Sequence, residues 1–548
     1  MSKKSSSKTN FLAQGTILVI ASFVAKAIGM IYRIPLTHIL GDDGNGYYST
    51  ANEIYTIILM ISSFSLPLAV SRLVAEREYA GEVKNSYKVL ICSLRFAAVT
   101  GGILSILTFL LGGVITKYVM GVELASYALR VLAPAIFLFA LTGVLRGFFQ
   151  GHGTMVPTAV SQIIEQIINA IVSVAGAYVM LQYGLKLGEK KGDAELGTAL
   201  AAAGGTFGTV ASVGVALLFI YLGYRNGFKR RMKKDKTRRR ESDRAIYRAI
   251  TYTILPIVLS TLVYNISTII DQGVFNHILA GMGFTQKQYA TVWGIYSGKF
   301  RVLMNVPLSI ASCLAPSVVP ALTEAMANND LREAGLRTRD TIRYTMVFTI
   351  PCAVGMAALA RPIMMMLYGN NDSLALAARI MQSGALLTVL LALSTLTTGI
   401  LQGLGEMQAP LVHAATAVAI HLGFLVLFVV KFKWNIYGVV YANIIFGLII
   451  CLLNARSIRK KLHYRQEIKK TFLVPVIAAG VMGIAAYLVH RVFNLFAGNT
   501  ISTILAVCVG AVVYGICLVK LGGILEREIR RLPKGDLLAD ILIRLNIL

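Results

Sequence analysis

The chain has 548 residues, of which 56% are hydrophobic and 14% charged, and its mean hydropathy is +0.67. A soluble protein of this size would carry more charge, and apolar runs of about 20 residues, long enough to cross a bilayer as a helix, recur along the whole sequence. The formal net charge of +27 lies mostly between these runs, so it does not indicate a nucleic-acid ligand. The six cysteines fall in apolar segments without metal-ligand spacing, and we predict neither a metal nor a cofactor.

The apolar runs predict an all-α integral membrane protein with fourteen transmembrane helices. The first run follows Lys3, Lys4 and Lys8 and is too long for the core of a signal peptide, so we interpret it as a span. The external loops are predicted to be short, with 184–196 the longest. The predicted spans are 10–40, 45–73, 87–117, 123–150, 155–183, 197–224, 249–280, 288–325, 332–359, 374–403, 408–431, 436–456, 470–495 and 499–525.

Lysine and arginine are unevenly distributed between the loops. Most of the 53 fall in the N-terminus, the even-numbered loops and the C-terminus, above all in the basic segment 225–248. The positive-inside rule therefore predicts that both termini are cytoplasmic. We interpret the basic segment as a topology signal that also meets anionic lipid. The tail 526–548 is amphipathic and is predicted to lie as a short helix on the cytoplasmic surface.

The sequence repeats itself after about 250 residues. Gln150–Pro157 (QGHGTMVP) recurs as Gln402–Pro410 (QGLGEMQAP), and Gly46–Ser49 (GYYS) has a weaker echo in Gly294–Ser297 (GIYS). Six predicted spans separate the copies, so the two halves share one orientation and form a parallel repeat. Parallel repeats build two bundles around a central cavity that opens to either side.

This repeat predicts two six-helix bundles, followed by two extra C-terminal helices. The predicted boundaries are 1–224 for the first bundle, 225–248 for the linker, 249–460 for the second bundle, 461–525 for helices 13 and 14, and 526–548 for the tail.

Charged and strongly polar residues inside the spans are candidates for substrate binding. A charge at mid-membrane depth costs about 2.5–3.5 kcal/mol on insertion scales, so such residues usually face a wet cavity. Several of them are cations, which suit an anionic cargo. The alternative is a set of ion pairs that only clamp helices, such as Arg33 with Glu53. The predicted substrate-binding residues are Lys26, Arg33, Glu53, Glu165, Asn169, Lys299 and Arg301.

Two further groups of polar residues each have two candidate roles. In span 5, Glu165 and Asn169 belong to a stripe at i+4 spacing that faces either the cavity or a neighbouring helix. Asp271 of span 7 is a candidate for coupling to Na⁺ or H⁺, together with Asn443 of span 12. In the clamping alternative, Asp271 pairs with Lys299 or Arg301.

No enzyme site is visible in the sequence. It has no phosphate-binding Walker loop, no HExxH and no nucleophile elbow. We therefore predict that the chain is not an enzyme and that transport is powered by an ion gradient, the membrane potential or the substrate gradient.

The segment GMIYRIPLTHILGDDGNGYYSTANEIY (29–55) is fairly specific, and 157–171 and 532–542 support it. With the fourteen spans, it resembles the multidrug/oligosaccharidyl-lipid/polysaccharide (MOP) exporter superfamily. Within this superfamily, the segment looks like the branch of stage V sporulation protein B and polysaccharide biosynthesis, which is close to MurJ-type lipid II flippases. The resemblance covers essentially the whole chain.

The resemblance implies a monomeric flippase in the bacterial plasma membrane. Its cargo would be an undecaprenyl-pyrophosphate-linked cell-wall precursor, moved from the inner to the outer leaflet by alternating access. Arg33, Arg301 and Lys26 match the family's cavity cations, which meet the pyrophosphate and sugar. Spans 13 and 14 would form a groove for the prenyl tail. The sequence departs from this pattern at Asn52 and Glu53, where relatives carry basic residues, and at Asn169, where arginine is frequent.

Three alternative functions make different demands on the sequence. Another undecaprenyl-linked oligosaccharide is the alternative cargo closest to this one. A cation-coupled multidrug antiporter of the same superfamily would need a cavity dominated by carboxylates and aromatic rings. A glycosyltransferase or polymerase would need catalytic carboxylates in long external loops, and the parallel repeat also favours a transporter.

Overall fold

The computed structural model describes residues 17–227, 241–464 and 466–524, apart from residue 19, and single positions at 526, 530, 536, 540 and 543. Every regular element in this part of the chain is a helix, which confirms the predicted all-α class. Twelve of the described helical segments are long and apolar enough to cross a membrane. Residues 228–240 of the predicted linker and most of the predicted tail 526–548 lie outside the described residues.

The twelve segments correspond to twelve of the fourteen predicted spans. The other two are the first and the seventh. In the first, the apolar helix Ile20–Ile31 is shorter than a full span, and α2 (Arg33–Leu59) follows it after one residue. Gly41, with φ 67°, interrupts α2 at the predicted boundary between spans 1 and 2. The seventh is the 39-residue helix α9 (Asp243–Gly281).

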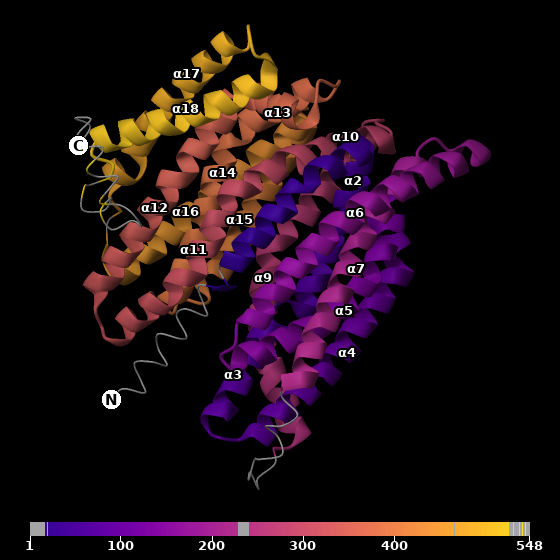
Figure 1. Cartoon of the computed structure of the whole chain (residues 1–548), viewed down its shortest axis with the longest axis vertical. Helices are drawn as coiled ribbons and strands as arrows, with labels where there is room; N and C mark the ends of the chain where they lie inside the picture. Colours follow the sequence, from indigo (N-terminus) through magenta and orange to yellow (C-terminus); the bar gives the residue numbers. More distant parts are fainter. Residues whose placement is uncertain are drawn as a thin grey trace. The chain divides into compact units, whose positions relative to one another are not determined.

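By its internal contacts the chain forms two compact units, Met1–Gly298 and Lys299–Leu548 (Figure 1). This division falls inside predicted span 8, whereas the predicted bundles follow the sequence repeat. Besides α2 and α9, the first unit contains the helices α3 (Leu66–Tyr79), α4 (Val83–Val114), α5 (Ala125–Gly151), α6 (Val156–Lys191), α7 (Leu196–Gly227) and α10 (Gln286–Ile295), with π-helical turns at η1 (Met60–Phe64) and η2 (Ile115–Val119).

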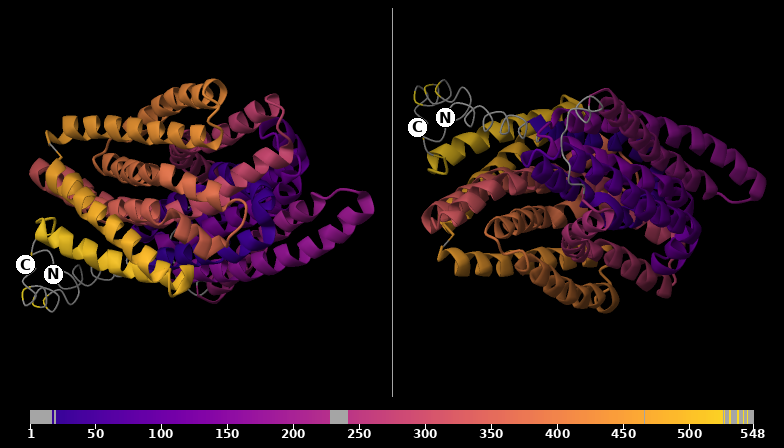
Figure 2. Two further views of the ribbon diagram at one scale, coloured as in Figure 1. Left: turned by 90° about the horizontal axis from the view of Figure 1, so that it is seen from above. Right: turned by 90° about the horizontal axis from the view of Figure 1, so that it is seen from below.

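The second unit ends in a helical hairpin formed by α17 and α18, which pack side by side (Figure 2). The π-helical turn η3 (Tyr296–Phe300) spans the boundary between the two units. The helices of the second unit are α11 (Arg301–Ala327), α12 (Leu331–Ala358), α13 (Ala360–Tyr368), α14 (Leu374–Gly403), α15 (Ala409–Val426), α16 (Ile436–Leu462), α17 (Val474–Phe493) and α18 (Gly498–Lys520), with π-helical turns at η4 (Leu427–Lys431) and η5 (Lys469–Leu473).

Two connections differ from their prediction. The expected long loop 184–196 is mostly helix, because α6 continues to Lys191 and ends at Gly192 in a left-handed cap. The connection between predicted spans 9 and 10 contains the short helix α13, which is too brief to register as a span. Neither segment carries a long apolar run, and hydropathy therefore gave no signal for either helix.

Glycine allows the helices of the first unit to touch backbone to backbone. A Cβ placed on Gly204 of α7 would lie 2.2 Å from the carbonyl oxygen of Gly176 in α6, and one on Gly208 would lie 2.1 Å from the Ser173 hydroxyl. Close packing of small residues is the usual basis of helix association in lipid, where the hydrophobic effect gives little help.

The sequence repeat is visible in this packing. In α5, Gly147 and Gly151 face α3, and a Cβ on Gly147 would lie 2.5 Å from the carbonyl oxygen of Pro67. Their counterparts in the second copy, Gly399 and Gly403 of α14, face α11 within the second unit. The same pair of glycines thus packs each repeat's fourth span against the helix of its second span.

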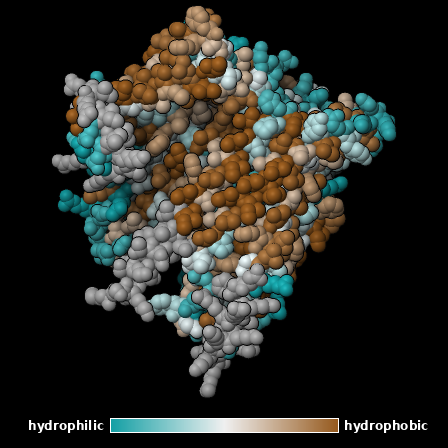
Figure 3. All heavy atoms as spheres, in the orientation of Figure 1, coloured by the Kyte–Doolittle hydropathy of each residue, from teal (hydrophilic) through white to brown (hydrophobic). Residues whose placement is uncertain are grey.

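Apolar side chains cover the outer faces of the helices. Figure 3 shows them in brown over the middle of α5, α6 and α7, with hydrophilic residues in teal near the helix ends. Large hydrophobic residues are widely exposed, among them Ile171, which is 61% exposed, and Leu218, which is 57% exposed. Such surfaces are typical of helices that face lipid.

The chain is anchored at Glu241–Asp243, within the last part of the basic segment. Glu241 accepts two hydrogen bonds from Arg77, at 3.1 and 2.8 Å, and Lys88 forms a 2.7 Å ion pair with Asp243. The hydrogen bond from Lys88 holds the pKa of the Asp243 carboxyl below its usual value. Ser242 caps α9 by accepting a hydrogen bond from Ala245.

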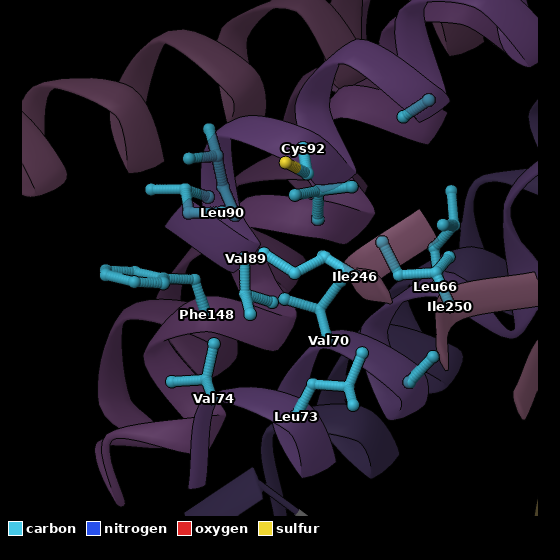
Figure 4. Close-up of a cluster of buried hydrophobic side chains, with 14 of the residues drawn as sticks. Leu66, Val70, Leu73, Val74, Val89, Leu90, Cys92, Phe148, Ile246 and Ile250 are labelled. Atoms are coloured by element: carbon cyan, nitrogen blue, oxygen red, sulfur yellow. The ribbon is translucent and has the colours of Figure 1, made fainter. Parts of the chain in front are cut away.

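Next to this anchor lies the hydrophobic core of α3, α4, α5 and α9 (Figure 4). Val70, Val89 and Phe148 are fully buried there, in the same cluster as Ile246 and Ile250 of α9. The ion pairs of the anchor and this core together hold the first turns of α9 against α3 and α4.

We expect Gly147→Ala to destabilise the protein by about 1–3 kcal/mol, because the added methyl group overlaps the Pro67 backbone. Gly102→Ala in α4 is the matched control. Its nearest neighbour would be 3.8 Å away, and alanine favours the helix. Thermal unfolding in detergent, followed by size-exclusion chromatography, should show a lower midpoint for Gly147→Ala alone. Equal midpoints would contradict the close contact.

Candidate functional site

Polar side chains gather inside the first unit where helix Ile20–Ile31, α2, α5 and α6 meet. The guanidinium carbon of Arg33 lies 4.4 Å from the centroid of the Tyr48 ring, a cation–π contact. Its Nη1 atom is buried and has no hydrogen-bond partner among the described residues. The ring face holds the cation in place without using its N–H donors, so Arg33 keeps donors for an anion.

Asn169 of α6 positions the residue next to Arg33. Its Nδ2 donates a 3.0 Å hydrogen bond to the Tyr32 hydroxyl, and its Oδ1 accepts one of 2.9 Å from Ser173. Tyr32 also interacts with Tyr48, which carries the Arg33 contact. Two predicted site residues, Arg33 and Asn169, are therefore connected through two tyrosines that the sequence analysis did not single out.

Glu165 has a partner that the sequence analysis missed. Arg146 of α5 is only 6% exposed, and its Nη2 donates to Glu165 at 2.8 Å while its Nε donates to the Ser161 hydroxyl at 2.9 Å. The two charges neutralise each other inside the helix bundle. The missed signal was Arg146 itself, a cation inside the apolar run of predicted span 4.

The polar stripe of α6 thus faces neighbouring helices along its described length. Gln162 accepts a 3.2 Å hydrogen bond from Ser22, and a Cβ on Gly29 would lie 3.3 Å from the Gln166 side-chain oxygen. Glu165 and Asn169 bind Arg146 and Tyr32, as described above. The hydrogen bonds described for this stripe are made to another helix, to Tyr32 or within α6.

A second polar group lies farther along α2, where α2 crosses α10. A Cβ on Gly46 would lie 2.1 Å from the Ala290 carbonyl oxygen, and one on Gly294 would lie 2.7 Å from the Gly46 nitrogen. One turn on, the hydroxyls of Ser49 and Ser297 are 2.6 Å apart. We call these four residues the glycine–serine contact. They are the first and last residues of the weak sequence echo, which the fold brings face to face.

Further hydrogen bonds surround the glycine–serine contact. Gln272 of α9 is fully buried and donates to the Thr50 hydroxyl at 2.5 Å. Asn276, also in α9, donates to the carbonyl of Met120 at 2.7 Å, and the hydroxyl of Tyr47 donates to Glu195 at 2.8 Å. Helices from both sequence repeats are thereby tied together at this end of the first unit.

The remaining predicted residues of the first unit lie as follows. Lys26 is exposed on helix Ile20–Ile31, and Glu53 of α2 is half-buried. Asp271 of α9 is buried, with 3% of its surface exposed. Within the part of the chain that the structure describes, no group of three or more His, Cys, Asp or Glu residues could hold a metal ion.

Three predicted residues belong to the second unit. Lys299 is 2% exposed, donates a 2.5 Å hydrogen bond to Ser373, and lies 5.7 Å from the centroid of the Tyr368 ring. Arg301 is half-buried at the first residue of α11, directly after the π-helical turn η3. Asn443 of α16 is half-buried and donates to the carbonyl of Val439, four residues earlier, at 3.0 Å.

Comparison with known proteins agrees with this fold. The family described as polysaccharide biosynthesis protein matches residues 11–326, and the MatE family matches 256–427. The chain is 27% identical to the lipid II flippase MurJ of Bacillus subtilis (strain 168) over 551 residues, which cover 95% of this chain and 97% of that protein. It is 23% identical to stage V sporulation protein B of the same organism over 529 residues, covering 96% and 98%.

Among solved structures, the lipid II flippase MurJ in an inward closed conformation matches with a TM-score of 0.65 at 17% identity, covering 92% of this chain and 98% of that one. This likeness extends over the helices of both units and concerns the fold. The chain therefore belongs to the polysaccharide biosynthesis protein family, within the MOP superfamily.

Proposed function

We propose that this membrane transporter is a flippase for a lipid-linked glycan. Its cargo would be an undecaprenyl-pyrophosphate-linked cell-wall precursor similar to lipid II. The observation that carries the proposal is the Arg33 guanidinium, which lies in a membrane helix with a buried Nη1 that has no hydrogen-bond partner among the described residues. A charged donor in this position is costly unless it serves an anionic ligand.

A pyrophosphate-linked lipid suits such a site. Its prenyl tail can remain in the bilayer while only the pyrophosphate and sugar head crosses, so the protein needs to lower the cost of moving the charged head alone. Guanidinium binds phosphate oxygens through paired, charge-assisted hydrogen bonds. Lys26, Lys299 and Arg301 would contribute further cations, and the pair of α17 and α18 would offer a groove for the tail.

The proposed transporter has the topology that the sequence predicts. It has fourteen helices with both termini in the cytoplasm, and two six-helix bundles that alternate between inward and outward openings. In this scheme the glycine–serine contact lies on the external side, where it closes the path between the two repeats. The contact must part for the head group to leave, and a hydroxyl pair backed by glycines has no bulky side chains to disengage.

A multidrug antiporter is the second candidate, because the MatE family matches 256–427. A cationic drug needs carboxylates that are free to bind it. Glu165 is paired with Arg146 at 2.8 Å, so it is already neutralised, whereas the donor that lacks a partner belongs to the cation Arg33. The charges of the first unit therefore favour an anionic cargo. A different undecaprenyl-linked oligosaccharide fits the same charges.

We expect Arg33→Gln to slow the flipping of fluorescent lipid II in proteoliposomes by about tenfold or more, the effect of losing a charge-assisted hydrogen bond. Accessibility of the head group to a membrane-impermeant quencher measures the rate. Arg72→Gln is the control, because that arginine has a 69% exposed side chain and, among the described residues, pairs with Glu76. An undiminished rate for Arg33→Gln would refute the assigned role, and folded wild-type protein that flips no lipid II would refute this cargo.

The Arg146–Glu165 pair is expected to clamp α5 to α6. Arg146→Met and Glu165→Met should each destabilise the protein by about 3–5 kcal/mol, because each leaves one buried charge without its partner. The double variant should recover most of this loss in thermal unfolding and should still flip lipid II. If the double variant is stable but inactive, the pair takes part in transport instead.

Locking the glycine–serine contact should stop transport. In a variant without native cysteines, Ser49→Cys and Ser297→Cys together should form a disulfide under oxidation, since the two hydroxyl oxygens are 2.6 Å apart. Flipping should fall on oxidation and return on reduction, and neither single cysteine should respond. Full activity of the cross-linked protein would show that the contact does not part.

A further inference from the structure

A cavity of 770 Å³ lies within the second unit, between α12, α14, α16 and the turn η5. Its inner wall is apolar and includes Ile342, Leu393 and Phe472. At its rim are Arg456 and Arg459, which are exposed and lie three residues apart on α16, so both project from the same side of that helix. The cavity therefore combines an apolar interior with two adjacent cations.

The two arginines are available for a ligand. The ion pairs of the described residues include neither of them. Asp340 pairs with Arg339 at 3.0 Å, Glu406 pairs with Lys461 at 2.9 Å, and Glu467 interacts electrostatically with Arg339. The rim of the cavity thus carries two arginines without an ion-pair partner among the described residues.

Tyr464 and Gln466, on either side of residue 465, form part of the cavity wall. The Tyr464 hydroxyl donates to Gln466 at 3.1 Å, and the Gln466 amide donates to the Thr471 hydroxyl at 3.0 Å. Burial raises the pKa of Tyr464 to about 12, so its hydroxyl stays neutral and can donate at any physiological pH. Next to this wall, Ile468 is 69% exposed and Leu452 is 61% exposed, as expected where a cavity opens to lipid.

We propose that this cavity binds one anionic phospholipid, with its phosphate between Arg456 and Arg459 and an acyl chain against the apolar wall. Pairs of arginines bind phosphate through directed hydrogen bonds, and basic pockets between transmembrane helices are typical sites for anionic lipid heads. The volume is that of a small-molecule pocket rather than of a protein interface. The site is separate from Arg33 and does not depend on the identity of the transported cargo.

Binding of phosphatidylglycerol and phosphatidylcholine to the full-length protein, measured by native mass spectrometry during lipid titration, tests the proposal. The wild type should retain one phosphatidylglycerol in preference to phosphatidylcholine. The double variant Arg456→Gln, Arg459→Gln should weaken retention of phosphatidylglycerol by about tenfold. Ala455→Phe keeps both arginines but fills the cavity from an exposed position, and it should weaken retention to a similar degree.

The matched control is the double variant Lys186→Gln, Lys190→Gln. These lysines are also exposed and one turn apart, near the end of α6, but they do not line this cavity. Retention should be unchanged in the control. Equal loss in both double variants would reduce the effect to general surface charge, and equal retention of the two phospholipids would also overturn the proposal. Displacement of phosphatidylglycerol by undecaprenyl phosphate, one molecule for one, would assign the cavity to the prenyl lipid instead.

Discussion

Contact between helix backbones at glycine is the constraint on which the rest of this structure depends. Lipid offers helices little hydrophobic reason to associate, so close packing and internal hydrogen bonds must hold them together. Glycines supply that closeness between α6 and α7, between α5 and α3, and between α14 and α11. Once the helices are this near, short side chains such as Ser173 and Asn169 can form hydrogen bonds inside the first unit, and the polar groups of the site find their places.

Two kinds of charged group occur inside the first unit. Arg146 and Glu165 satisfy each other and the nearby Ser161, so their cost of burial is offset within the fold. Arg33 is different, since an aromatic ring contacts its face while a buried donor has no hydrogen-bond partner among the described residues. The first kind needs nothing from outside the protein. The second keeps a donor that could serve an anion, as we propose, and the two kinds correspond to the clamping and the binding roles that the sequence left open.

Hydropathy predicted the membrane helices closely, because apolar length alone decides whether a segment spans a bilayer. The predicted span 374–403 has the same bounds as α14, whereas α13 and the end of α6 escaped prediction because they are short or polar. The partners of charged residues were harder to predict. The ion pair of Glu165 with Arg146 depends on how α5 and α6 are rotated against each other, and spacing along one helix cannot reveal that rotation.

The glycine–serine contact has a consequence for how such a chain arises. Each repeat contributes a glycine and, one turn later, a serine, and each residue of one copy meets its counterpart in the other. This is the geometry of an isologous interface, in which one patch of surface pairs with itself about a two-fold axis. Two separate copies of a half-length chain could make the same contact without any new residue. A homodimer of that kind would contain the same contact, and joining its two chains into one would allow each half of the repeat to change by itself.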